Sequence, residues 1–155
     1  MASTDVETNV VECPNCGRRN RVPTIADGVP QCGDCGAALP WIGVAGDDNF
    51  AEVVDRSSIP VVVDLWATWC GPCRMVSPAL EQVARDLAGR IKLVKVDVDK
   101  APAIAERFDV QAVPTLLVMK NGQVVATQLG AVPAHMLRAW VEGALAEVAR
   151  SSSGT

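Results

Sequence analysis

Six cysteines arranged as three Cys-x-x-Cys pairs constrain this chain more than any other feature. The pairs begin at Cys13, Cys32 and Cys70, and fifteen residues separate the first two pairs. Residues 1–7 lack the basic and apolar segments of a secretory signal, which indicates a cytoplasmic, reducing environment. Cysteines in such an environment serve more often as metal ligands or catalytic thiols than as structural disulfides.

The length and charge of the chain limit the classes of protein to consider. Its 155 residues allow one ordinary domain and a small appendage. A formal net charge of -4 gives no overall attraction to nucleic acid or to anionic membranes. No apolar run reaches the roughly 18 to 20 residues of a membrane-spanning helix. We therefore expect neither nucleic acid nor a membrane as a partner.

The first two cysteine pairs have the spacing of a metal site. Each pair lies in a segment rich in Gly, Pro, Asn and Asp, which predicts tight turns. Four thiolates on two turns suit tetrahedral Zn²⁺ and leave no open position for catalysis, so we expect one structural zinc ion per chain. The alternative role is a redox sensor, in which oxidation of the four ligands to disulfides ejects the metal. Two disulfides or an iron site remain open as alternatives. The predicted ligands are Cys13, Cys16, Cys32 and Cys35.

The composition changes after this segment and predicts the domain organisation. We expect a zinc ribbon over residues 1–40, a linker over 41–46, an α/β domain over 47–149 and a disordered tail over 150–155. A ribbon of about 40 residues has almost no core, so metal would hold it together.

The pattern of the larger domain alternates helices and strands. Apolar β-branched runs predict strands, and helical periodicity with Pro and Gly at the ends predicts helices. Asn121-Gly122 between two apolar runs predicts a hairpin. Asp47 or Asp48 is expected to cap the first helix. The expected helices are 49–54, 72–88, 101–108 and one from about 135 to 148; the expected strands are 60–67, 91–97, 115–120 and 123–127.

The third pair lies where a buried strand ends and a helix begins, in Trp69-Cys70-Gly71-Pro72-Cys73. Unpaired N–H groups and the positive end of the dipole at a helix N-terminus favour a thiolate over a thiol. We therefore expect Cys70 to be the nucleophile and Cys73, one turn later, the resolving thiol. A structural disulfide or half of a metal site is the alternative.

Asp64 interrupts the apolar strand before this motif. A buried carboxylate is costly, and burial raises its pKa. We expect Asp64 to accept and donate the proton of Cys73 through water, with Lys95 on the neighbouring strand partly offsetting the effect of burial on that pKa. A carboxylate at the sheet edge that meets solvent is the other reading.

Several motifs in order and spacing resemble the thioredoxin family over residues 47–148. They are Asp64-Leu65-Trp66-Ala67, Trp69-Cys70-Gly71-Pro72-Cys73, Lys95-Val96-Asp97, Val113-Pro114-Thr115, Lys120-Asn121-Gly122 and Gly130. The added cysteine pairs, with Arg18-Arg19-Asn20-Arg21-Val22-Pro23 and Gly130-Ala131-Val132-Pro133, resemble the zinc-binding second type of bacterial thioredoxin.

The resemblance implies a thioredoxin fold, a mixed sheet flanked by helices, and a protein-disulfide reductase. It implies a cis Val113-Pro114 bond facing the dithiol and an apolar rim that binds substrate backbone. Disulfide-containing proteins would be the substrates of a monomer that a thioredoxin reductase recharges. Without a dinucleotide fingerprint, we expect no directly bound NADPH or flavin. The rim residues are Trp69, Gly71, Pro72, Val113, Pro114, Gly130 and Ala131.

A second function class is a zinc-ribbon adaptor on a passive thioredoxin scaffold. The presence of both thiols of the third pair disfavours it.

Overall fold

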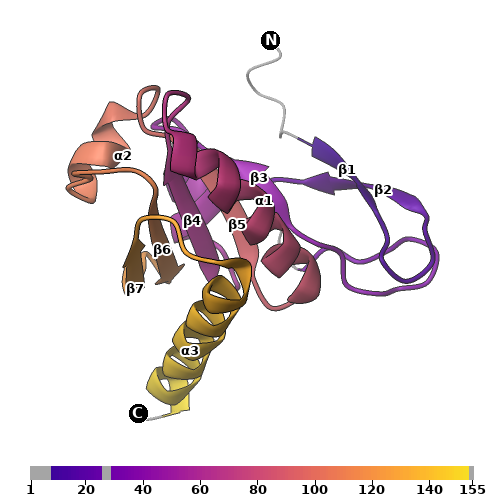
Figure 1. Ribbon diagram of the computed structural model, residues 1–155. Helices are drawn as coiled ribbons and strands as arrows, with labels where there is room; N and C mark the ends of the chain where they lie inside the picture. The colour runs from indigo at the N-terminus through magenta and orange to yellow at the C-terminus, as the bar shows by residue number, and fades with distance from the viewer. Residues whose placement is uncertain (1–7, 26–28, 154–155) are drawn as a thin grey trace.

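The computed structural model of the protein describes residues 8–25 and 29–153. Over these residues the chain forms a two-stranded hairpin and a five-stranded sheet with helical segments on both faces (Figure 1). The elements are β1 (Thr8–Glu12), β2 (Arg19–Pro23), β3 (Ile42–Val44), η2 (Ala51–Asp55), β4 (Val61–Trp66), α1 (Gly71–Asp86), β5 (Lys92–Asp97), α2 (Pro102–Arg107), β6 (Thr115–Lys120), β7 (Gln123–Leu129) and α3 (Ala134–Ser153).

The larger sheet is mixed, as predicted, and its strand order is β3-β5-β4-β6-β7. Strands β3 and β4 run parallel to β5, whereas β6 runs antiparallel to β4 and β7 antiparallel to β6. The predicted hairpin is confirmed, because Asn121 and Gly122 both adopt positive φ values, 54° and 75°. Strand β4 lies at the centre, which explains its nearly continuous apolar sequence.

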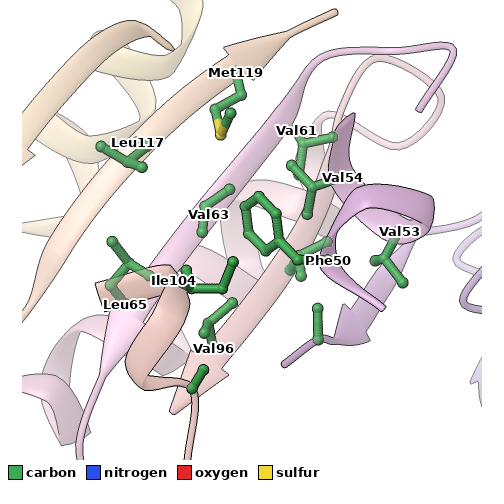
Figure 2. Close-up of a cluster of buried hydrophobic side chains, with 13 residues drawn as sticks. Phe50, Val53, Val54, Val61, Val63, Leu65, Val96, Ile104, Leu117 and Met119 are labelled. Carbon is green, nitrogen blue, oxygen red and sulfur yellow. The ribbon is translucent and has the colours of Figure 1, made fainter. Parts of the chain in front are cut away.

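Successive side chains of β4 point to opposite faces and separate two cores. Val61, Val63 and Leu65 pack with η2 and α2 in the cluster shown in Figure 2. Val62 packs on the other face, in a cluster formed with α1 and α3. By the same alternation Asp64 points towards α1, which brings it beneath the helix that begins with the third cysteine pair.

Residues 41–46, predicted as a linker, are part of the sheet. Ile42–Val44 is the edge strand β3 and pairs with Leu93–Lys95 of β5. Trp41, just before it, is buried. The prediction of a linker was wrong because a three-residue edge strand is too short to show a period in the sequence.

The predicted helix 49–54 is a single π-helical turn, η2, with no side-chain cap. Asp47 instead accepts hydrogen bonds from the N–H groups of Ala103 and Ile104, at 3.1 and 3.0 Å, and so caps α2. The prediction that Asp47 or Asp48 caps the first helix was therefore wrong, because the Asp47 carboxylate caps α2, a helix more than fifty residues later in the chain.

The last helix is longer than predicted. It continues to Ser153, beyond residue 149 where the domain was expected to end, and residues 154–155 of the expected tail lie outside the described residues.

Candidate active site and metal centre

The third cysteine pair forms a disulfide at the N-terminus of α1. Cys70 is the N-cap residue, and its sulfur accepts a hydrogen bond from the Cys73 N–H at 3.1 Å. Both sulfurs belong to buried residues, whereas the adjacent Trp69 is 68% exposed and donates its indole N–H to Asp99. The structure therefore places the first thiol at the end of a helix dipole, in a position that stabilises negative charge on sulfur.

A cis bond between Val113 and Pro114 lies beside this disulfide, as the resemblance to thioredoxins implied. Val113 packs against a small cluster that contains Cys70 and Cys73. The carbonyl of Pro114 accepts a hydrogen bond from the Gly130 N–H at 3.0 Å, which ties a second loop to the first.

Three further residues of the predicted rim are exposed to solvent. Gly71 and Pro72 are exposed between the two cysteines, and Ala131 is exposed next to Gly130.

Asp64 lies beneath α1 and is 0% exposed. Its Oδ2 accepts a hydrogen bond from the Ser77 hydroxyl at 2.9 Å, whereas Oδ1 has no partner among the described residues. Burial raises the pKa of this carboxyl to about 6 against the opposing effects of Ser77 and Lys95. A group with that pKa changes its protonation close to neutral pH, as a proton acceptor must.

Lys95 lies opposite Asp64 in the pairing of β4 with β5, and its ammonium forms an ion pair with Glu81 of α1. The sequence reasoning missed both Ser77 and Glu81. A signal was present, because these residues follow Cys73 at intervals of four and share its face of the helix. A cavity of about 250 Å³ adjoins this face. It is lined by Trp66, Ala67, Thr68, Cys73, Arg74, Ser77 and Lys95.

The first two cysteine pairs meet in the N-terminal hairpin and the turn that follows it. Their four sulfur atoms lie within 4.8 Å of one another. The sulfur of Cys13 is 3.6 Å from that of Cys35, and the sulfur of Cys16 is 3.6 Å from that of Cys32. A tetrahedron with Zn–S bonds of about 2.3 Å requires sulfur separations of about 3.8 Å. The donor set and its dimensions therefore fit a tetrahedral zinc ion.

The two pairs share one backbone conformation. In each, the N–H of the first cysteine donates to the carbonyl five residues later at 2.8 Å, and the N–H four residues later donates back to its carbonyl at 2.9 Å. Gly17 and Gly36, which follow the second cysteines, have φ values of 82° and 79°. A side chain is strained at such φ values, so glycine is needed at both turns.

Hydrogen bonds to sulfur make the pKa values of the cysteine thiols unequal. The N–H groups of Cys35 and Asp34 lower the pKa of the Cys32 thiol to about 6. A hydrogen bond from Asn15 lowers the pKa of Cys35. For Cys16, the Arg18 N–H acts to lower the pKa, but burial and the neighbouring thiols raise it to about 12. A divalent cation bound at the centre would replace the remaining protons, because cysteine ligands bind metal as thiolates.

The comparisons with known proteins agree with the active-site geometry. The sequence profile of the thioredoxin family matches residues 41–143. The chain belongs to the thioredoxin family. It is 50% identical to the thioredoxin of Haemophilus influenzae over 91 residues, and this alignment covers 59% of this chain and 85% of that protein. As a member of this family with both thiols in place, the protein is a thiol-disulfide oxidoreductase.

A second relative extends into the N-terminal residues. Thioredoxin C-3 of Corynebacterium nephridii is 36% identical over 136 residues, which cover 86% of this chain and 93% of that protein. That alignment is longer than residues 41–155, so it includes part of the N-terminal segment.

The cysteine hairpin packs on the thioredoxin domain through Trp41. The side chain of Trp41 is 1% exposed and belongs to the cluster around Cys13 and Cys32, and its indole N–H donates to the Pro23 carbonyl at 2.8 Å. The ammonium of Lys92 lies 4.2 Å from the centre of the Trp41 ring.

Lys92 is itself buried and donates to the Val53 carbonyl at 2.8 Å. Burial lowers the pKa of its ammonium to about 8.

The described part of the chain contains no helix with the length and hydropathy needed to cross a membrane.

Proposed function

We propose that the protein is a cytoplasmic protein-disulfide reductase of the zinc-binding second type of thioredoxin. The observation that carries this proposal is the disulfide at the N-terminus of α1, with a buried carboxylate beneath it and a cis proline beside it. A scaffold that only displayed a zinc ribbon would need none of these three features.

In the proposed reaction the Cys70 thiolate attacks one sulfur of a substrate disulfide. The S–S bond breaks, the other substrate sulfur leaves as a thiolate and takes a proton, and Cys70 is joined to substrate as a mixed disulfide. Asp64 then accepts the proton of Cys73, whose sulfur attacks Cys70 and releases the second substrate thiolate. The product is the Cys70–Cys73 disulfide, which a thioredoxin reductase returns to the dithiol.

The proposed substrate surface is the rim around the disulfide. Trp69 is exposed next to Cys70, Val113 packs with the two cysteines, and a hydrogen bond joins the loops of Pro114 and Gly130. A short extended segment of substrate can add its backbone hydrogen bonds to those of Val113. Recognition of backbone predicts a broad range of substrate proteins, as the resemblance implied.

The proposed metal ligands are Cys13, Cys16, Cys32 and Cys35. When bound, zinc holds the two cysteine turns together, and with four protein ligands it has no place for a substrate. The geometry of the two turns comes from the chain itself: glycines occupy the positions of positive φ, and Asn15 and Asn20 donate hydrogen bonds to sulfur. We propose residues 1–40 as this zinc module, with the catalytic domain beginning at Trp41.

Substitution of each active-site cysteine tests the reductase. With insulin as substrate, Cys70→Ser should abolish disulfide reduction, whereas Cys73→Ser should retain the substrate as a stable mixed disulfide, because only the second thiol resolves the adduct. Mass spectrometry of the trapped species under non-reducing conditions identifies it. Equal trapping by the two variants reverses or removes the assignment, and insulin reduction that persists in both supports a scaffold whose thiols are passive.

A further inference from the structure

The face of α1 that follows Cys73 carries two polar side chains that the reaction above does not use. Ser77 and Glu81 follow Cys73 at four-residue intervals, so all three lie on one side of the helix. Each contacts a different residue of the sheet beneath: Ser77 contacts the buried Asp64, and Glu81 contacts the partly exposed Lys95. A helix that only packed on the sheet would present apolar residues here, as Val76, Leu80 and Val83 do towards the core.

The Ser77 hydroxyl makes the two oxygens of Asp64 unequal. Oδ2 accepts its hydrogen bond at 2.9 Å, and Oδ1 is buried without a partner within residues 8–25 and 29–153. A hydroxyl that donates to a carboxylate favours the charged form and fixes the plane of the group. The unpartnered oxygen is then the one with a lone pair available for a proton.

Lys95 is the ammonium that faces Asp64 across the sheet, and its partner is Glu81 rather than Asp64. The Lys95 charge lowers the pKa of Asp64, while the Glu81 charge raises it. On the other side of β4, the residue opposite Asp64 is the apolar Leu116 of β6. Among the described residues, the charged groups acting on Asp64 are thus Lys95 of β5 and Glu81 of α1.

The cavity of about 250 Å³ reaches the donor of the proton, Cys73, and the hydrogen-bond partner of its acceptor, Ser77, which line it together with Lys95. A volume of this size holds several water molecules, each of which occupies about 30 Å³ in the liquid. Most of its wall is apolar, and its polar lining residues, which include Thr68, Ser77 and Lys95, offer such molecules hydrogen-bond partners.

We propose that Ser77 and Glu81 are positioning residues for proton transfer at Cys73. Ser77 holds Oδ2 of Asp64 and leaves Oδ1 to take the proton as Cys73 attacks the Cys70 sulfur, and Glu81 keeps the Lys95 ammonium in an ion pair instead of releasing it to the carboxylate. The proton passes from the Cys73 sulfur to Oδ1 of Asp64 and is released to solvent before the next cycle. This inference rests on the proposed role of Asp64.

Ser77 lowers the pKa of Asp64 and Glu81 raises it, so their substitutions should shift the Asp64 titration in opposite directions. The Asp64 carboxyl is titrated by ¹³C NMR in the full, zinc-loaded chain, and the pH–rate profile of insulin reduction is measured in parallel. Ser77→Ala should shift the Asp64 titration to higher pH, because the charged form loses its hydrogen bond. Glu81→Gln should shift it to lower pH, because a repelling charge is removed. Each profile should move with its titration.

Matched controls separate positioning from packing. Ser77→Thr keeps the hydroxyl and should restore the wild-type titration, and Glu142→Gln removes the same charge on α3 and should leave it unchanged. If neither Ser77→Ala nor Glu81→Gln moves the Asp64 titration, or if both move it in the same direction, the positioning role is overturned. A wild-type pH–rate profile in Asp64→Asn removes Asp64 from the reaction and overturns the positioning role with it, whereas the reductase function is decided separately by the Cys70 and Cys73 variants.

Discussion

Asp64 occupies a position in β4 where the sheet would otherwise take an apolar side chain. Its burial favours the neutral acid, so the folded chain holds a proton that the unfolded chain has released between pH 3.8 and about 6. The contribution of Asp64 to stability is therefore fully present below pH 3.8 and is lost as the pH rises through 6. At neutral pH the group destabilises the fold that it serves.

Asp64→Asn should slow disulfide reduction and stabilise the fold at the same time. The variant should reduce insulin more slowly, because the titrating group is gone, and should unfold in urea with a free energy at pH 7 raised by up to about 3 kcal/mol. The wild type should approach the variant in stability as the pH falls towards 4. A variant less stable than wild type at pH 7 would contradict the burial argument.

The partners of Asp64 mark the limit of sequence reasoning at the residue scale. The six cysteines and Asp64 stand out because thiols at fixed spacing and a charge in an apolar strand are local signals. Ser77 and Glu81 do not stand out, because a helix surface carries many polar residues. Only the register of α1 over β4 and β5 selects these two.

Elements with strong periods were predictable, and those that depend on a distant partner were not. Strand β4, the β6–β7 hairpin and helix α1 follow from apolar runs, Asn-Gly and the Pro near a helix start. Strand β3 depends on pairing with β5, and the cap of α2 comes from Asp47, more than fifty residues earlier. Neither leaves a local pattern.

The cap of α2 is testable with neighbouring residues. Asp47→Ala removes the acceptor of two N–H groups and should lower the free energy of unfolding by about 1 kcal/mol. Asp48→Ala, the adjacent exposed carboxylate, is the matched control and should change it by less than about 0.5 kcal/mol. Equal effects of the two substitutions in urea unfolding would show that Asp47 acts only through its charge.

At the scale of the whole molecule, the zinc module should fold with its metal. Zinc analysis should give one ion per chain for the wild type and none for Cys13→Ala/Cys16→Ala. Chelation should unfold the module, because binding of about 10–16 kcal/mol exceeds what so small a core supplies. Insulin reduction should persist in the chelated protein, since the two main cores lie within the thioredoxin domain. Undiminished zinc in the double variant refutes the ligand assignment.

The contact between module and domain should respond to alkaline pH. The folded chain lowers the pKa of Lys92 from 10.5 to about 8, so the unfolded chain binds more protons between these values and stability should rise across them. Unfolding in urea from pH 8 to 10 should show this rise in the wild type and in the exposed control Lys100→Met. The rise should be smaller in Lys92→Met; an identical slope in all three contradicts the buried site.

The place of Trp41 also makes the protein its own optical probe. The chain has four tryptophans and no tyrosine, so its ultraviolet emission comes from indole alone. Trp66 packs in the cluster around the active-site disulfide, whereas Trp41 is enclosed between the cysteine hairpin and Lys92. A spectrum from a Trp41-only chain should therefore shift to longer wavelength when the hairpin detaches and admits water, while one from a Trp66-only chain should change in intensity when the disulfide opens. The two single-tryptophan chains would then report metal loss and redox state separately.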